Sequence, residues 1–191
     1  ESGKGGGSSS FDNSTVEVAD ELNLGAGSSR SLSGGAISAT TIRSYANIEA
    51  SNTAIEANAI TNVGTLKTSN GTINAHAIAN AGTANFINTK LNIDRFVTYD
   101  GSTLLLNNTD VTMVEFVARG TFIIDPAYFE ATMMDTTEGI TVVGRGSVAK
   151  IGGGYDDLKS IISSAGFTPS ESGTAASGFT VAADEAVLAL N

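Results

Sequence analysis

Apolar side chains in residues 37–90 recur with a period of 18 residues. Three consecutive rows begin at Ile37, Ile55 and Ile73. In each row a second isoleucine follows five positions later, and another apolar residue follows six positions after that. A fixed period of this kind is typical of a protein built from stacked, equivalent units. The other aligned columns are Ile42, Ile60 and Ile78; Ile48, Leu66 and Ala84; Ala39, Ala57 and Ala75; and the polar set Asn52, Asn70 and Asn88.

The length of the repeat decides what one unit can be. Helical-hairpin repeats need about 33 residues or more, so this unit is too short for two packed helices. Its apolar positions lie 5, 6 and 7 residues apart, and Ile37 and Ala39 alternate with polar Ser38 and Thr40. This alternation is the period-two pattern of short strands. The rows therefore predict an all-β fold, a parallel β-solenoid with 18-residue coils stacked about 4.8 Å apart.

Two further positions of the repeat predict the corners of each coil. The column of Asn52, Asn70 and Asn88 places one asparagine at the same point of three successive coils. We expect these side chains to stack their amides in a ladder at a corner. Gly64 and Gly82 also share one position, where we expect the chain to turn.

The pattern extends beyond the three clear rows, with less regularity. Residues 16–36 predict a degenerate first coil, in which Leu24 falls in the column of Ile42. Extending the period forward places Phe122 beneath Leu104 and Phe86, with Ile140 one period later. Further strands are expected at Val111–Ala118, Thr121–Asp125 and Ile140–Val143.

The two ends of the chain differ from the repeat. Residues 1–15 are rich in glycine and serine, which predicts a flexible arm. Apolar residues between Leu158 and Ala165 follow helical spacing and predict a short helix that caps the end of the solenoid. The expected segments are the arm (1–15), the solenoid domain (16–151, with its clear repeats at 37–108), and the helical cap with a C-terminal tail segment (152–191).

Composition and charge narrow the classes of partner. The chain of 191 residues has no cysteine, so no disulfide can form, and its formal net charge is −10. Most of this charge lies in residues 91–191, which hold 13 acidic and 5 basic residues. An acidic chain is a poor match for nucleic acid or for anionic lipid, so we expect neither as a partner. Because no apolar run reaches the roughly 20 residues that cross a bilayer, we also expect no membrane span.

Acidic residues leave calcium as the one cofactor to consider. Calcium prefers several carboxylate and carbonyl oxygens. No EF-hand spacing and no glycine–aspartate calcium repeat is present, however. We therefore expect a solvated acidic face, no cofactor, and calcium only as an option that no motif supports. The candidate ligands are Asp94, Asp100, Asp110, Asp125, Asp135, Glu138, Asp156 and Asp157.

Enzymatic interpretations have little support in the sequence. The only histidine, His76, stands in a polar column and is expected on the surface. The strict six-residue spacing of left-handed hexapeptide acyltransferases is absent. A carboxylate pair for glycoside hydrolysis could be drawn from Asp94, Asp100 and Asp110, but their spacing singles out no pair. An ice-binding threonine ladder would have only Thr65 over Thr83, which is too short. We expect no enzymatic activity.

The repeats resemble those of a known family of surface proteins. The stretch GTLKTSNGTINAHAIANAGTANF resembles the Asn/Gly/Thr-rich repeats of filamentous-haemagglutinin-type bacterial adhesins and autotransporter passengers. The resemblance covers residues 37–108. It implies a secreted or surface-displayed structural β-helix without catalytic residues.

These observations together predict a structural protein outside the cell or at its surface. We expect a self-assembling subunit of an extracellular filament or surface layer, whose partner is a second copy of the chain. Polymerisation would proceed by strand pairing of the termini and the solenoid ends. A monomeric surface adhesin or passenger fragment that binds glycans or a host protein is the alternative, and a carbohydrate enzyme is a distant third class. The residues expected to carry assembly are Phe11, Val16, Val18, Phe179 and Val181.

The register of the core is tested by a matched pair of substitutions. Ile60→Asp should lower the free energy of unfolding by several kcal/mol, because it buries an unpaired charge. Asn58→Asp, two positions away on the outward face, should cost less than about 1 kcal/mol. Thermal melting of the two variants checks this, and equal shifts of their melting temperatures would refute the proposed register.

Overall fold

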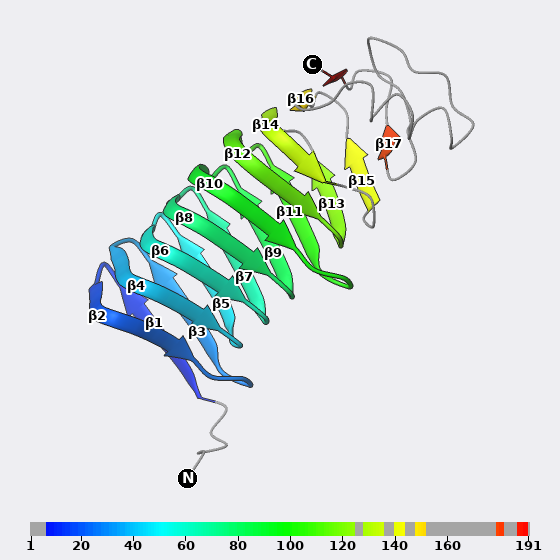
Figure 1. The fold of residues 1–191 in the computed structure, drawn as a ribbon. Coiled ribbons are helices and arrows are strands. Elements are labelled where there is room, and N and C mark those ends of the chain that lie inside the picture. Colours follow the sequence, from blue (N-terminus) through cyan, green and yellow to red (C-terminus); the bar gives the residue numbers. More distant parts are fainter. Residues whose placement is uncertain are drawn as a thin grey trace.

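The structure is a parallel β-solenoid. The computed structural model describes residues 7–124, 128–135, 140–143, 148–151, 179–181 and 187–190. In these residues 18 strands form two parallel sheets of nine strands each, which we name sheet A and sheet B. Figure 1 shows the coils stacked along one axis, beginning with the first two strands in blue. The all-β fold and the parallel stacking predicted from the sequence are confirmed.

Odd-numbered strands form sheet A, and even-numbered strands form sheet B. The strands of sheet A are β1 (Ser8–Asp12), β3 (Ser29–Ser33), β5 (Asn47–Ser51), β7 (Thr65–Ser69), β9 (Thr83–Ile87), β11 (Thr103–Asn107), β13 (Thr121–Ile124), β15 (Ile140–Val143) and β17 (Phe179–Val181). The strands of sheet B are β2 (Thr15–Leu24), β4 (Ala36–Ser44), β6 (Ala54–Asn62), β8 (Thr72–Asn80), β10 (Lys90–Thr98), β12 (Val111–Ala118), β14 (Tyr128–Asp135), β16 (Val148–Ile151) and β18 (Val187–Leu190). One strand of each sheet makes one coil.

Equivalent residues of successive coils pair directly, as the period of 18 predicts. Ile37 pairs with Ile55 and Ile55 with Ile73 along sheet B. The columns that start at Ile42 and Ala39 pair in the same way. In sheet A, Ile48 pairs with Leu66 and Leu66 with Ala84. The proposed register of residues 37–90 is therefore confirmed.

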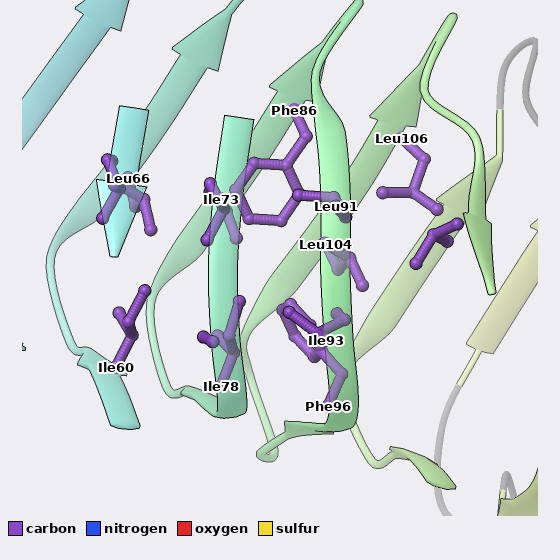
Figure 2. Close-up of a cluster of buried hydrophobic side chains, with 14 of the residues drawn as sticks. Ile60, Leu66, Ile73, Ile78, Phe86, Leu91, Ile93, Phe96, Leu104 and Leu106 are labelled. Atoms are coloured by element: carbon purple, nitrogen blue, oxygen red, sulfur yellow. The ribbon is translucent and has the colours of Figure 1, made fainter. Parts of the chain in front are cut away.

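The core lies between the two sheets and changes in character along the axis. Isoleucine, leucine and alanine fill the early coils, and Ile60, Ile73 and Ile78 are almost fully buried. Figure 2 shows these side chains, with Leu66, Phe86 and Phe96, pointing into the space between the sheets. Burying one such side chain stabilises the folded state by about 1.5–3 kcal/mol relative to leaving it exposed. In the later coils five phenylalanines pack edge to face or tilted, with ring centroids 4.5–6.3 Å apart: Phe86, Phe96, Phe116, Phe122 and Phe129.

The corner between sheet A and sheet B is built on left-handed asparagines. Asn52, Asn70 and Asn88 have φ of 51°, 52° and 46°, and Asn13 and Asn108 take the same conformation in their coils. Asparagine tolerates this conformation better than most residues. The predicted amide ladder of Asn52, Asn70 and Asn88 is confirmed only between its last two members, where Asn88 Nδ2 donates to Asn70 Oδ1 at 2.6 Å. The ladder continues instead to Asn108, whose Nδ2 donates to Asn88 Oδ1 at 3.2 Å, and no amide hydrogen bond joins Asn52 to Asn70 in the described residues.

A second amide ladder, which was not predicted, lies inside the core. Asn62 and Asn80 pair in register and are fully buried. Asn62 Nδ2 donates to Asn80 Oδ1 at 2.7 Å, and Asn80 Nδ2 donates to the carbonyl oxygens of Gly82 and Thr103 at 3.1 and 3.0 Å. These bonds hold the chain where it leaves sheet B. The stacked glycines there are required, since a Cβ on Gly82 would collide with the carbonyl oxygen of Gly64.

Three details of the predicted register are wrong because some coils are longer than 18 residues. A bulge between Val18 and Glu21 places Leu22, not Leu24, against Ile42. Thr83 pairs with Thr103, an offset of 20 residues, so Phe122 follows Leu104 and Ala84 instead of Phe86. The column of Ile140 is also shifted. Ile140 pairs with Thr121, one residue before the expected Phe122.

The solenoid also begins earlier than the expected boundary at residue 16. Ser8–Asp12 forms strand β1, which pairs in parallel with β3. The amide of Ser29 donates to the carbonyl oxygen of Gly7 at 3.2 Å. The expectation of a flexible arm over residues 1–15 is therefore wrong for residues 8–12, because their backbone is paired with β3 in the first coil. The expected helix between Leu158 and Ala165 lies outside the described residues.

Backbone strain at the asparagine corner can be separated from the amide ladder. Asn70→Ala should lower the free energy of unfolding by about 1–2 kcal/mol, because alanine is strained in the left-handed conformation. Asn70→Gly should cost less, since Gly34 occupies the equivalent corner with φ of 73°. Chemical denaturation measures both. Equal losses would show that the amide, and not the backbone, carries the effect.

Breaking the buried amide ladder should lower the free energy of unfolding more than breaking an exposed one. Asn80→Ala removes the donor to two buried carbonyl groups and the acceptor for Asn62, so it should cost at least about 2 kcal/mol. Asn92 is the matched control, because its exposed amide donates to Asn74 Oδ1 at 2.6 Å. Asn92→Ala should cost less than about 1 kcal/mol. Indistinguishable denaturation midpoints for the two variants would contradict this assignment.

Candidate functional site

The first coil presents an open end to its surroundings. Strand β1 is the first strand of sheet A and β2 is the edge strand of sheet B, so each pairs on one side only among the described strands. The apolar residues of β2 that continue the core columns, Val16, Val18, Leu22 and Leu24, are only half-buried. Their partners one coil further in, such as Ile37 and Ile42, are 4% and 3% exposed. This end therefore exposes unpaired backbone groups beside an incompletely covered core.

The same end carries features that limit indiscriminate pairing. The bulge between Val18 and Glu21 interrupts the ladder of β2. Glu17, Asp20 and Glu21 are exposed on this strand. Glu21 Oε2 lies 3.2 Å from Arg43 Nε, and both side chains are about half-exposed. Bulges and charges on an edge strand are common devices against unspecific aggregation, so a partner for this end must match its shape and its negative charge.

The residues predicted to carry assembly fall at two opposite edges. Phe11 lies on β1, pairs with Leu32 and is 37% exposed. Val16 and Val18 lie on β2 at the same end. Phe179 and Val181 lie on β17, the last strand of sheet A, where they pair with Thr141 and Val143. The structure thus brings the three N-terminal residues together and places the other two at the far edge.

A shallow groove on the outer face of sheet B is a second candidate site. Its volume is about 890 Å³, and it crosses β2, β4, β6 and β8. In β4 the inward residues Ala39 and Ile42 are three positions apart instead of two, which requires a local bend in the strand. The groove follows this bend from coil to coil. Its walls are polar, and its floor includes Ala39, Ala57 and Ala75.

Two columns of polar side chains line this groove. The first contains Ser38, Glu56 and Asn74, and Asn74 Nδ2 donates to Glu56 Oε1 at 3.3 Å. The second contains Thr40, Asn58 and His76. The sequence predicted an outward-facing second column, but it did not predict the groove. The irregular step from Ala39 to Ile42 is the only signal that could have indicated it.

Where the structure describes them, the side chains considered for catalysis or metal binding form no larger cluster. His76 is on the surface, as predicted, and its Nδ1 lies 2.6 Å from Asp94 Oδ2. Within the described part of the chain, no group of three or more acidic, histidine or cysteine side chains is placed to hold a metal ion. For Asp125, Glu138, Asp156 and Asp157 the structure describes no position. The threonine column considered for ice binding is longer than the sequence indicated. Thr65 pairs with Thr83, and the column continues through Thr103 and Thr121.

Comparison with protein-family models, with curated proteins and with solved structures found no match. The stacked parallel coils themselves establish the class of the chain, a β-solenoid repeat protein. In the residues that the structure describes, no helix is long and apolar enough to cross a membrane.

Proposed function

We propose that the chain is a structural, non-enzymatic subunit that polymerises end to end into an extracellular filament or surface layer. The observation that carries this proposal is the open first coil, where β1 and β2 pair on one side only among the described strands and the core columns end half-covered. Such an edge is a template for strands of another chain.

The geometry of the solenoid favours a linear polymer over a closed oligomer. Each coil adds to the previous one by nearly the same translation, with Ile37, Ile55 and Ile73 in direct register. A second copy that continued this stacking would present the same free end again. Head-to-tail contacts that do not close generate filaments. The partner edge would then include β17, which carries Phe179 and Val181.

The extracellular location is part of the proposal and rests on the resemblance of residues 37–108 to surface-adhesin repeats. The chain also contains no cysteine that an oxidising environment would cross-link. A monomeric adhesin remains the alternative function. The two differ in a simple observable, since only the structural subunit forms fibres on its own.

The assembly edge can be tested with one substitution on β1. Phe11→Asp places a charge on the open edge, so it should reduce the yield of fibres at least about tenfold. Negative-stain electron microscopy and light scattering over a range of protein concentrations measure assembly. Because Phe11 is 37% exposed, the subunit should remain folded, and circular dichroism checks this.

Val114→Asp is the matched control for this test. Val114 is 50% exposed on β12, in the middle of the solenoid, so a charge there changes the surface without touching the open edge. This variant should assemble like the original chain. The proposal fails if the original chain stays monomeric at every concentration, or if Phe11→Asp assembles as well as Val114→Asp.

A further inference from the structure

We propose that Asn70 is a self-modification site, at which the backbone nitrogen of Gly71 attacks the asparagine side chain and converts it to aspartate or isoaspartate. Asn70–Gly71 is the only asparagine–glycine pair in the chain. It lies at the asparagine corner between sheet A and sheet B, where Asn70 is exposed. A hollow of about 360 Å³ on the outside of this corner is lined by both residues, so water reaches them.

The reaction needs no reagent other than water. The Gly71 nitrogen loses its proton to solvent and bonds to Asn70 Cγ, while the bond from Cγ to Nδ2 breaks and ammonia leaves with a proton from water. The product is a five-membered succinimide ring. Water then adds to one of the two ring carbonyl carbons and opens the ring. Opening at Cγ gives aspartate, and opening at the backbone carbonyl carbon gives isoaspartate.

The peptide group between Asn70 and Gly71 is free to rotate toward the side chain. Neither the carbonyl oxygen of Asn70 nor the amide of Gly71 makes a hydrogen bond to another described residue. The groups on either side are held, since the Asn70 amide donates to Ile87 and the Gly71 carbonyl oxygen accepts from Lys90, each at 3.0 Å. Glycine also permits the rotation because it has no Cβ. The nucleophile can therefore approach Cγ without breaking a hydrogen bond.

The amide ladder activates the side chain that is attacked. Asn88 Nδ2 donates to Asn70 Oδ1 at 2.6 Å. Negative charge develops on this oxygen as the Gly71 nitrogen adds to Cγ, and a donor already in place stabilises that charge. The leaving nitrogen, Asn70 Nδ2, donates to no other described residue. Its departure therefore leaves the ladder bond intact.

Neighbouring corners have the same backbone conformation but lack this combination. Asn52 and Asn88 have φ of 51° and 46°, and threonine follows each of them. Thr53 and Thr89 are both 2% exposed, and their hydroxyl groups donate to backbone carbonyl groups. The amide of Thr89 also donates to Thr109 Oγ1 at 3.2 Å. Burial and hydrogen bonds thus hold the attacking residue in place, so we expect these corners to react slowly.

The two products have different effects on the coil. Aspartate keeps an acceptor for Asn88 Nδ2 and tolerates the left-handed conformation. Isoaspartate routes the backbone through Cβ and Cγ, which adds one atom to the main chain and disturbs the register with the next coil. Both products replace a neutral amide by a carboxylate. The modification therefore adds negative charge to aged subunits, and its isoaspartate form destabilises this coil.

Incubation of the full chain in mildly alkaline water enriched in heavy oxygen tests the proposal. Peptide mapping by mass spectrometry locates the label, because each new carboxylate takes its oxygen from the solvent. Asn70 should be labelled at least about tenfold faster than Asn52 or Asn88. Equal labelling of the three asparagines would overturn the assignment. The reaction is intramolecular, so the result does not depend on whether the protein polymerises.

Asn88→Asp tests the role of the ladder. Its carboxylate still accepts from Asn108 Nδ2 but cannot donate to Asn70 Oδ1. The folded variant, checked by circular dichroism, should be labelled at Asn70 about 3- to 10-fold more slowly than the original chain. In denaturing guanidinium chloride, where no ladder exists, the two chains should react at equal rates. An unchanged rate in the folded variant, or the same slowing in denaturant, would overturn the role of Asn88 as the activating donor.

Discussion

The direct pairing of equivalent residues between parallel coils is the constraint on which the rest of this structure depends. When Ile60 pairs with Ile78 and Asn62 with Asn80, one backbone ladder aligns an apolar column and a polar column at the same time. A slip of one residue would exchange the inward and outward side chains. The left-handed asparagines at the corners, such as Asn70 and Asn88, keep each coil returning to the same register.

The same constraint links the core to the proposed functions. A stack of parallel coils satisfies its backbone only between coils, so the strands at its ends remain unpaired unless another segment covers them. The half-buried Val16 and Leu22 follow from this geometry. The regular stacking also repeats any outward side chain along the axis, which produces the polar columns beside Asn58 and His76. The open end and the groove are thus two consequences of one repeat.

Much of the fold could be predicted because the period of 18 is written in large apolar residues such as Ile55 and Ile73. The errors arise where the coil length changes, since the offset of 20 residues at Thr83 and Thr103 leaves no mark in composition. Strand β1 was assigned to the flexible arm because three of its five residues are serines, which carry no apolar side chain. The groove was missed because concavity depends on how a strand bends. Of the candidate assembly residues, the pattern placed Val16 and Val18 in the first coil, and they lie on β2, the edge strand of sheet B.

The central claim is that copies of the chain continue the coil stacking of the subunit. X-ray diffraction from oriented fibres of the purified protein tests this claim most directly. If coils continue across each junction, the strands lie perpendicular to the fibre axis, and a sharp meridional reflection appears at about 4.8 Å. Fibres without this meridional reflection, or a protein that forms no fibres, would contradict the account.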